Sequence, residues 1–157
     1  MLIGKKCTHV PENAQSTAMH ETTHNILFLN ERLKKFGESL TSLCSFCELE
    51  NENIKHLFCD CPVTKDLWNQ LKDKTHLDLP DLTPKSAFFG FFEQQNQTIF
   101  HIHLIFRIAV YNRRSSNICS VDYVMNKIKQ VKKMEENSSN SARSRERWRN
   151  KWAIWDF

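Results

Sequence analysis

The sequence CSFCELENENIKHLFCDC, residues 44–61, contains four of the chain's six cysteines together with one histidine. Its spacing is C-x2-C-x8-H-x4-C, counted through Cys44, Cys47, His56 and Cys61. Three sulfurs and one ring nitrogen complete a tetrahedral ligand set for Zn2+ and leave no position for a water molecule. The spacing therefore predicts a closed site that holds one structural zinc ion.

Three other uses of these residues are open. A Cys44–Cys47 redox pair needs a thioredoxin-like βαβ setting, and the sequence shows none. Disulfides are disfavoured if the chain lies in a reducing compartment. A catalytic Cys59 or Cys61 with His56 as its base would need an orienting partner, and no residue nearby is suited to that role. Structural zinc is the favoured interpretation.

The fourth ligand has two candidates, because Cys59 lies three residues after His56 and competes with Cys61. Pro62 follows Cys61 directly and favours an extended ligand residue at the start of a helix. We therefore predict that Cys61 is the ligand and that Cys59 is a buried, apolar thiol. The connecting sequence ELENENIK is polar and acidic, which predicts a solvent-facing loop.

The composition favours helices. The chain has 157 residues, enough for one domain or for a small domain with an extension. Hydrophobic residues make up 40% and charged residues 25%, as in a globular protein. Three glycines and four prolines leave little turn chemistry for an all-β fold. The predicted fold class is mostly α: a small helical domain organised around the zinc-binding loop.

Apolar residues recur at helical spacing along the chain. The first predicted elements are a helix over 19–36 ended by Gly37, a loop through the cysteines, a helix from Pro62 and a short helical turn after Thr83. They are followed by a buried central helix over 99–110, a helix capped by Ser120, a polar break over 135–144 and a tail helix. In the helix from Pro62, the residues expected to face the core are Val63, Leu67, Trp68 and Leu71. In the helix after Ser120, they are Val121, Val124, Met125, Ile128 and Val131.

Charge is unevenly distributed. Residues 1–100 hold 10 Lys/Arg and 13 Asp/Glu, a net charge of −3, whereas residues 101–157 hold 12 and 5, a net charge of +7. A basic segment attracts a phosphate backbone, although it is equally typical of a solvated helical face. We expect three parts: a loose lead-in at 1–18, a zinc-binding helical domain at 19–115, and basic helices with a Trp-rich tail at 116–157.

No apolar run is long enough for a signal peptide core or a membrane span. We therefore expect an intracellular protein, the nucleus included, that has no membrane contact.

The stretch LTSLCSFCELENENIKHLFCDCPVTKDLW resembles the zinc-binding region downstream of the reverse transcriptase in LINE-type (non-LTR) retrotransposon polyproteins. The matching positions are Cys44, Cys47, His56-Leu57-Phe58, Cys61 and Trp68. The segments ILFLNERLKKFG, LTPKSAFFGFF, HIHLIFRIAVYNRR and the closing basic helix are also similar to that family. The resemblance covers most of the chain and implies the C-terminal part of such a polyprotein.

The resemblance implies a region that grips template RNA or target DNA. Its parent polyprotein would carry the polymerase, and that polymerase domain is an expected partner. A reverse transcriptase needs paired aspartates to hold two metal ions, and this sequence has no Asp-Asp pair. We therefore expect a chain that is not itself an enzyme.

Basic side chains near the C-terminus are the candidates for phosphate contacts: Lys127, Lys129, Lys132, Lys133, Arg143, Arg145, Arg147 and Arg149. Trp148 and Trp152 either stack on unpaired bases or pack onto the body of the protein. The alternative function is a zinc-stabilised docking module that binds a protein and no nucleic acid. Its anchor would be the stripe of Trp148, Trp152 and Trp155, since aromatic side chains dominate interface energetics.

Overall fold

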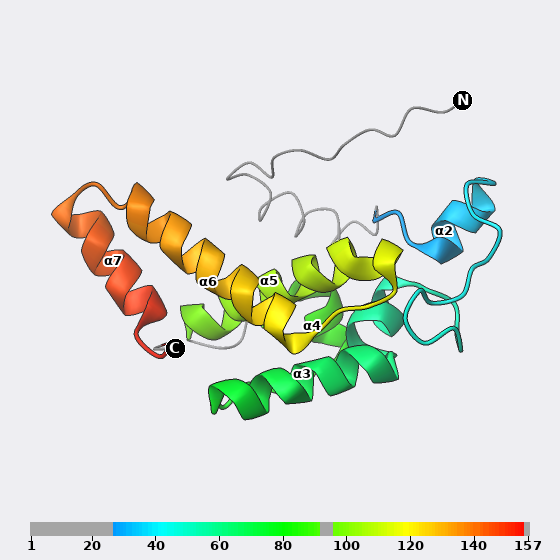
Figure 1. The fold of residues 1–157 in the computed structure, drawn as a ribbon, viewed down its shortest axis with the longest axis horizontal. Coiled ribbons are helices and arrows are strands. Elements are labelled where there is room, and N and C mark those ends of the chain that lie inside the picture. The colour runs from blue at the N-terminus through cyan, green and yellow to red at the C-terminus, as the bar shows by residue number, and fades with distance from the viewer. Residues whose placement is uncertain (1–26, 92–95, 156–157) are drawn as a thin grey trace.

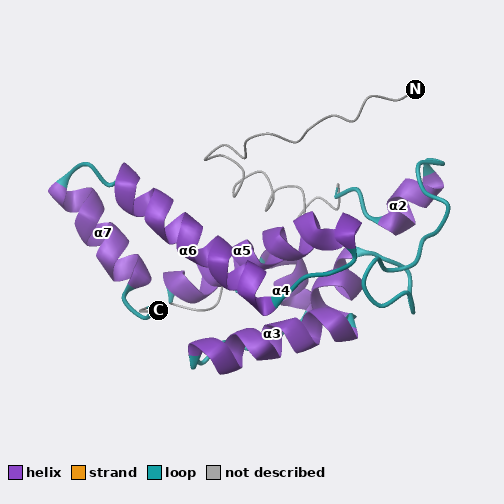
Figure 2. Cartoon of the chain, in the orientation of Figure 1, coloured by secondary structure: helices purple, strands orange, loops and turns teal. Residues whose placement is uncertain are grey.

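The computed structural model describes residues 27–91 and 96–155 of the chain. These residues are mostly helical, which confirms the predicted fold class (Figure 2). The elements are α2 (Asn30–Lys35), a π-helical turn η1 (His56–Asp60), α3 (Pro62–Thr75), α4 (Pro84–Phe89), α5 (Gln97–Arg113), a 3-10 turn η2 (Arg114–Ser116), α6 (Val121–Ser138) and α7 (Ala142–Trp152). The predicted lead-in at 1–18 lies outside the described residues.

Helix α5 is the centre of the fold. α6 packs across α5 and also contacts α3, while α7 folds back against α6 and α5 (Figure 1). Ile102, Phe106 and Val110 of α5 are completely buried, as expected for a helix that is apolar on nearly all sides. α2 and the cysteine segment lie at the opposite end of the molecule from α7 (Figure 1).

Helix α3 joins the cysteine segment to this core. Pro62 occupies its first turn, where the missing N–H is not needed. Trp68 is 1% exposed, its indole N–H donates to the Pro80 carbonyl at 2.9 Å, and its ring packs edge-on against Phe106. The prediction for Val63 was wrong, since its side chain is 38% exposed. Val63 lies outside the buried face of α3, which is formed by Thr64, Leu67, Trp68, Leu71 and Thr75.

The first predicted helix is shorter than expected. Residues 19–26 of that prediction lie outside the described part, and residues 27–29 are not helical. Leu27 and Leu29 are buried while Phe28 between them is 57% exposed, which is the alternation of an extended segment. Glu52 holds the chain here, because its carboxylate accepts the first free N–H of the helix, that of Asn30, at 3.0 Å.

The end of α2 lies where the sequence predicts it. Gly37 has a φ of +74°, in the left-handed region that glycine adopts without strain. The N–H of Glu38 donates to the Leu33 carbonyl at 2.9 Å, and that of Gly37 donates to Lys34 at 3.1 Å. These two bonds form a Schellman motif, which satisfies carbonyls that the helix leaves free.

Helices α6 and α7 are separated by a much shorter break than predicted. The Ser120 hydroxyl accepts from the Tyr123 N–H and begins α6, as expected. The predicted inward face is confirmed, since all five of its members are buried or pack, half-buried, against the core: Val121, Val124, Met125, Ile128 and Val131. α6 then continues through Ser138, and Ser141 already caps α7. The expected polar break over 135–144 is therefore wrong except at residues 139–141.

The core contains residues from both sides of residue 115, where the sequence analysis divides the chain. That division stays a prediction. Within the described ranges, no helix combines the length and the apolar character that a membrane crossing requires.

We expect Trp68→Ala to lower the free energy of unfolding by about 3–5 kcal/mol, because it removes a buried indole and leaves a cavity beside α5. Val63→Ala, in the exposed position on the same helix, should cost about 0.5 kcal/mol or less. Urea unfolding followed by circular dichroism measures both. Equal losses in the two variants would contradict the packing described for α3.

Candidate metal centre and basic surface

The segment that carries Cys44 and Cys47 folds back on itself. Leu43 and Asn51 form an antiparallel bridge, and the Cys44 N–H donates to the Glu50 carbonyl at 2.8 Å. The backbone N–H groups of Phe46 and Cys47 donate to the Cys44 sulfur. This tight turn directs both sulfurs to one side, as the two-residue spacing predicts. We call residues 42–52 the knuckle.

His56 and Cys61 meet through an unusual helical turn. The Cys61 N–H donates to the His56 carbonyl at 2.7 Å, which is a bond between residues five apart. This is π-helical geometry, in which the wider turn brings such residues onto one side. The Asn53 side chain accepts the His56 N–H at 2.9 Å and fixes the start of the turn. This element was not predicted from the sequence, which indicated a loop here.

Together the knuckle and the π-helical turn bring four donor atoms to one point. The ligand atoms of Cys44, Cys47, His56 and Cys61 all lie within 4.8 Å of one another. The Cys44 and Cys61 sulfurs are 3.8 Å apart, and the Cys47 sulfur lies 3.2 Å from Nε2 of His56. Tetrahedral zinc would set these distances at about 3.8 Å and about 3.6 Å. The donor set and its spacing therefore suit a metal ion.

These cysteines are free thiols in the described chain. The 3.8 Å between the Cys44 and Cys61 sulfurs is far longer than a disulfide bond of about 2.05 Å. Cys59 is not one of the clustered residues, and its sulfur lies instead 3.7 Å from the Leu82 carbonyl. Of the two candidates for the fourth position, the structure thus brings Cys61 into the cluster and buries Cys59.

The buried sulfurs favour a positive charge at their centre. A hydrogen bond from the Cys44 thiol, followed by bonds from the Thr64 N–H, the Thr64 hydroxyl and the Val63 N–H, lowers the pKa of Cys61. The same bond to Cys61, with burial, raises the pKa of Cys44. A bound metal ion would displace the thiol protons, because cysteine coordinates metals as the thiolate. The Glu50 carboxylate lies 3.3 Å from Nδ1 of His56, an arrangement that leaves Nε2 for a metal.

Residues 7–68 match the family model for zinc-binding in reverse transcriptase. Comparisons with curated proteins and with solved structures gave no match. The matched range contains all four residues of the metal cluster and ends at Trp68 in α3. This family model describes a zinc-binding domain, which is an accessory to the polymerase and not its catalytic part.

An ion pair ties this zinc-binding-type region to the rest of the fold. Glu52 is completely buried, and its carboxylate lies 3.0 Å from Nε of Arg114, just after α5. The same carboxylate accepts the Ser45 N–H at 2.8 Å. The prediction of a solvent-facing loop over residues 48–55 was therefore wrong for Glu52. No local pattern identifies it, because its partner lies far along the chain.

The predicted phosphate-binding cations fall into three groups. Three contact other groups of the protein: Lys127 lies over the Tyr123 ring, Lys132 donates to the Trp155 carbonyl at 2.5 Å, and Lys133 pairs with Glu136 at 3.0 Å. Arg145 is exposed and reaches only the Asn140 carbonyl, at 3.5 Å. The others are exposed and their side chains have no hydrogen bond or ion pair to a described residue: Lys129, Arg143, Arg147 and Arg149.

The tryptophans pack onto the body of the protein. Trp152 is 3% exposed and Trp155 is completely buried, so their rings are covered. Trp148 is half-buried, and its indole N–H donates to the Lys132 carbonyl at 3.1 Å. Of the two interpretations in the sequence analysis, packing fits Trp152, while Trp148 keeps part of its surface accessible.

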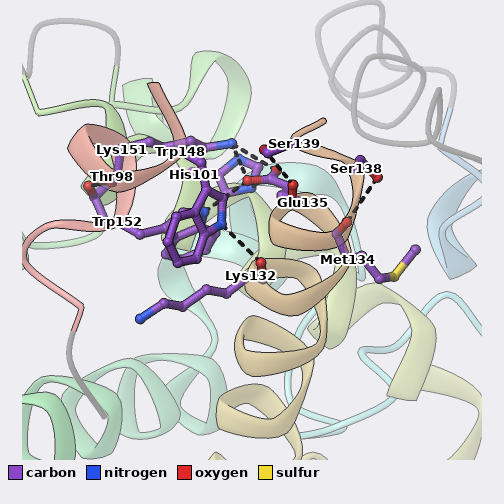
Figure 3. Close-up of polar contacts among 10 residues, drawn as sticks. All are labelled: Thr98, His101, Lys132, Met134, Glu135, Ser138, Ser139, Trp148, Lys151 and Trp152. Carbon is purple, nitrogen blue, oxygen red and sulfur yellow. Dashed lines mark hydrogen bonds and ion pairs between the residues drawn. The ribbon is translucent and has the colours of Figure 1, made fainter. Parts of the chain in front are cut away.

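Glu135 holds α7 in place (Figure 3). Its carboxylate accepts from Lys151 at 2.8 Å and from the Trp152 indole at 2.9 Å, and lies 3.0 Å from Nε2 of His101. A further bond joins the Thr98 hydroxyl to the Lys151 carbonyl. Burial raises the pKa of Glu135, but the bonds from His101, Lys151 and Trp152 outweigh it and lower the pKa to about 2. Glu135 was predicted to lie in a polar break, but it belongs to α6.

We expect one zinc ion per purified chain, bound by the cluster. Cys44→Ser and Cys61→Ser should each lose the ion, because each removes a thiolate, whereas Cys59→Ser should keep it. Elemental analysis of the folded proteins measures the ratio. Retention of zinc by Cys61→Ser together with loss by Cys59→Ser would contradict the ligand set.

The pKa of Glu135 leads to a second prediction. Its folded value of about 2 lies below the unfolded value of about 4.3. The carboxylate therefore stabilises the fold above pH 4.3, and this contribution is lost as the pH falls toward 2. Wild type should have a higher Tm than Glu135→Gln at pH 6, and the gap should narrow below pH 4. Glu136→Gln, on the exposed neighbour, is the control, and an equal gap in that variant would refute the role of Glu135.

Proposed function

We propose that this chain is a zinc-stabilised helical module that binds RNA or DNA and does not catalyse a reaction on it. It would correspond to the region downstream of the reverse transcriptase in LINE-type retrotransposon polyproteins, with the polymerase domain as a partner and the nucleus as a place of action. The observation that carries the proposal is the cluster of four ligand residues inside the range that matches the zinc-binding model.

The residues that would hold zinc are Cys44, Cys47, His56 and Cys61. With all four coordinated, no position is left for a substrate or a water molecule, so the ion would be structural. The ion would link the knuckle to Cys61, the residue directly before α3. Because such a site does not exist in an unfolded chain, binding free energy would become folding free energy.

The surface that supports nucleic-acid binding lies on α6 and α7. Four exposed cations project from these helices without a partner among the described residues: Lys129, Arg143, Arg147 and Arg149. Cations on a helix contact phosphates with little dependence on sequence. The bonds of Glu135 to Lys151 and Trp152 join α7 to α6, so these charges lie on two helices that contact each other.

This proposal predicts a salt-dependent affinity. The logarithm of the affinity for single-stranded RNA should fall linearly with the logarithm of the salt concentration, with a slope of about −0.7 for each phosphate contacted. Fluorescence anisotropy with a labelled oligonucleotide, between 50 and about 200 mM salt, measures the slope.

Changing Arg143, Arg147 and Arg149 together to Glu should abolish binding, while the control Lys133→Glu, at a residue already paired with Glu136, should weaken it much less. Affinity that does not change with salt, or that survives the triple change, would refute the phosphate-binding role.

A second candidate function, docking to a protein, is favoured by exposed apolar side chains at the other end of the molecule. Leu49 in the knuckle is 72% exposed, Leu40 just before it is fully exposed, and Phe36 at the end of α2 is 62% exposed. Such side chains mark interaction sites when they gather on one surface. In the tryptophan stripe that was predicted as the anchor, Trp152 and Trp155 are covered and only Trp148 keeps part of its surface accessible. Under this candidate, Leu40→Ser and Leu49→Ser would abolish the partner interaction and the arginine changes would not.

A further inference from the structure

A groove of about 880 Å3 lies between α5, α6 and α7. Its apolar lining includes Ile105 and Ile108 from α5 and Val131 and Met134 from α6. Pockets for small molecules and cofactors commonly have volumes of about 300–1,000 Å3 and a mostly apolar lining with a few polar groups. The groove is therefore large enough for one or two nucleotide units.

The same groove carries side-chain amides from all three helices: Gln97 and Asn112 from α5, Gln130 from α6 and Asn150 from α7. The side-chain amides of Asn112 and Asn150 have no hydrogen-bond partner among the described residues, and both residues are exposed. An amide both donates and accepts, which is the pattern that the edges of nucleobases present. Trp148, half-buried, adds part of an indole ring to the lining.

The charge of the groove favours an anionic occupant. Lys127, Arg147 and Lys151 line it, and Glu135 is the one carboxylate among the described lining residues. That carboxylate is already bound by Lys151, by the Trp152 indole and by His101 (Figure 3). Arg147 is exposed and makes no ion pair with a described residue, so its guanidinium is available at the edge of the groove.

We infer that this groove receives unpaired bases of a single-stranded nucleic acid, while Arg147 contacts the adjoining phosphate. The apolar lining of the groove and the Trp148 ring would contact the faces of a base, and the side-chain amides of the lining would contact its edges. The bases of a duplex are stacked and paired, so they cannot enter. This inference rests on the proposed function. It adds that single strands bind more tightly than duplexes, and that strands with bases bind more tightly than abasic strands.

The test compares two labelled oligonucleotides by anisotropy: a uridine decamer and an abasic decamer with the same phosphates. Bases that stack on protein side chains contribute enough that the uridine decamer should bind about tenfold or more tightly. The full chain with zinc is used. Because the phosphates are equal, the ratio of the two affinities isolates the contribution of the bases.

Met134→Lys should reduce this ratio to about one, because it replaces an apolar side chain of the groove lining with a charged one. Met134 is 56% exposed, so the change should leave the core intact. The matched control is Asn126→Lys, which adds the same charge to an exposed position of α6 outside the groove, and which should keep the ratio. Asn112→Leu, on the α5 side of the groove, should lower the ratio without any change in charge.

Equal affinities for the two decamers in the wild type would overturn the inference and leave an acidic peptide as the better occupant, while the proposed function would stand. A ratio unchanged in both groove variants would also overturn it. If neither decamer bound even at low salt, the inference and the proposed function would both be refuted.

Discussion

The fold depends on the meeting of three sulfurs and one imidazole at the boundary between an irregular segment and a helical core. The knuckle has few apolar side chains of its own to bury, and its outer surface carries exposed leucines. Cys61 links the cluster to the start of α3, and α3 carries Trp68 into the centre of the molecule. A metal ion at this point would therefore stabilise both the local turn and its attachment to the core, because coordination free energy becomes folding free energy.

Two acidic residues attach the ends of the molecule to its core: Glu52, which is completely buried, and Glu135, which is half-buried. Glu52 receives two backbone N–H groups and the Arg114 guanidinium, so it holds the knuckle against the end of α5. Glu135 receives Lys151 and the Trp152 indole, so it holds α7 against α6. The first is at the knuckle end of the molecule and the second at the α7 end. Removing Arg114 would be costly, because it would leave the buried carboxylate of Glu52 without its cation.

The sequence identifies what depends on local spacing. The four clustered residues, the buried central helix and the caps at Ser120 and Gly37 all follow from residue type and interval. It does not identify what depends on distant partners. The π-helical turn has no signature in propensity, and Glu52 and Glu135 look like ordinary surface carboxylates until Arg114 and Lys151 are placed beside them. Lys132 looks free for the same reason, although it reaches the Trp155 carbonyl.

The most direct test of this account is the optical spectrum of the full chain when Co2+ replaces its metal ion. The geometry predicts one Co2+ per chain, with the intense visible bands of a tetrahedral site and the charge-transfer absorption of three thiolates. Those bands should be lost on Cys61→Ser and kept on Cys59→Ser. Weak bands of an octahedral site, or no change of the spectrum on adding Co2+, would show that the cluster does not form a closed metal centre and would contradict the central claim.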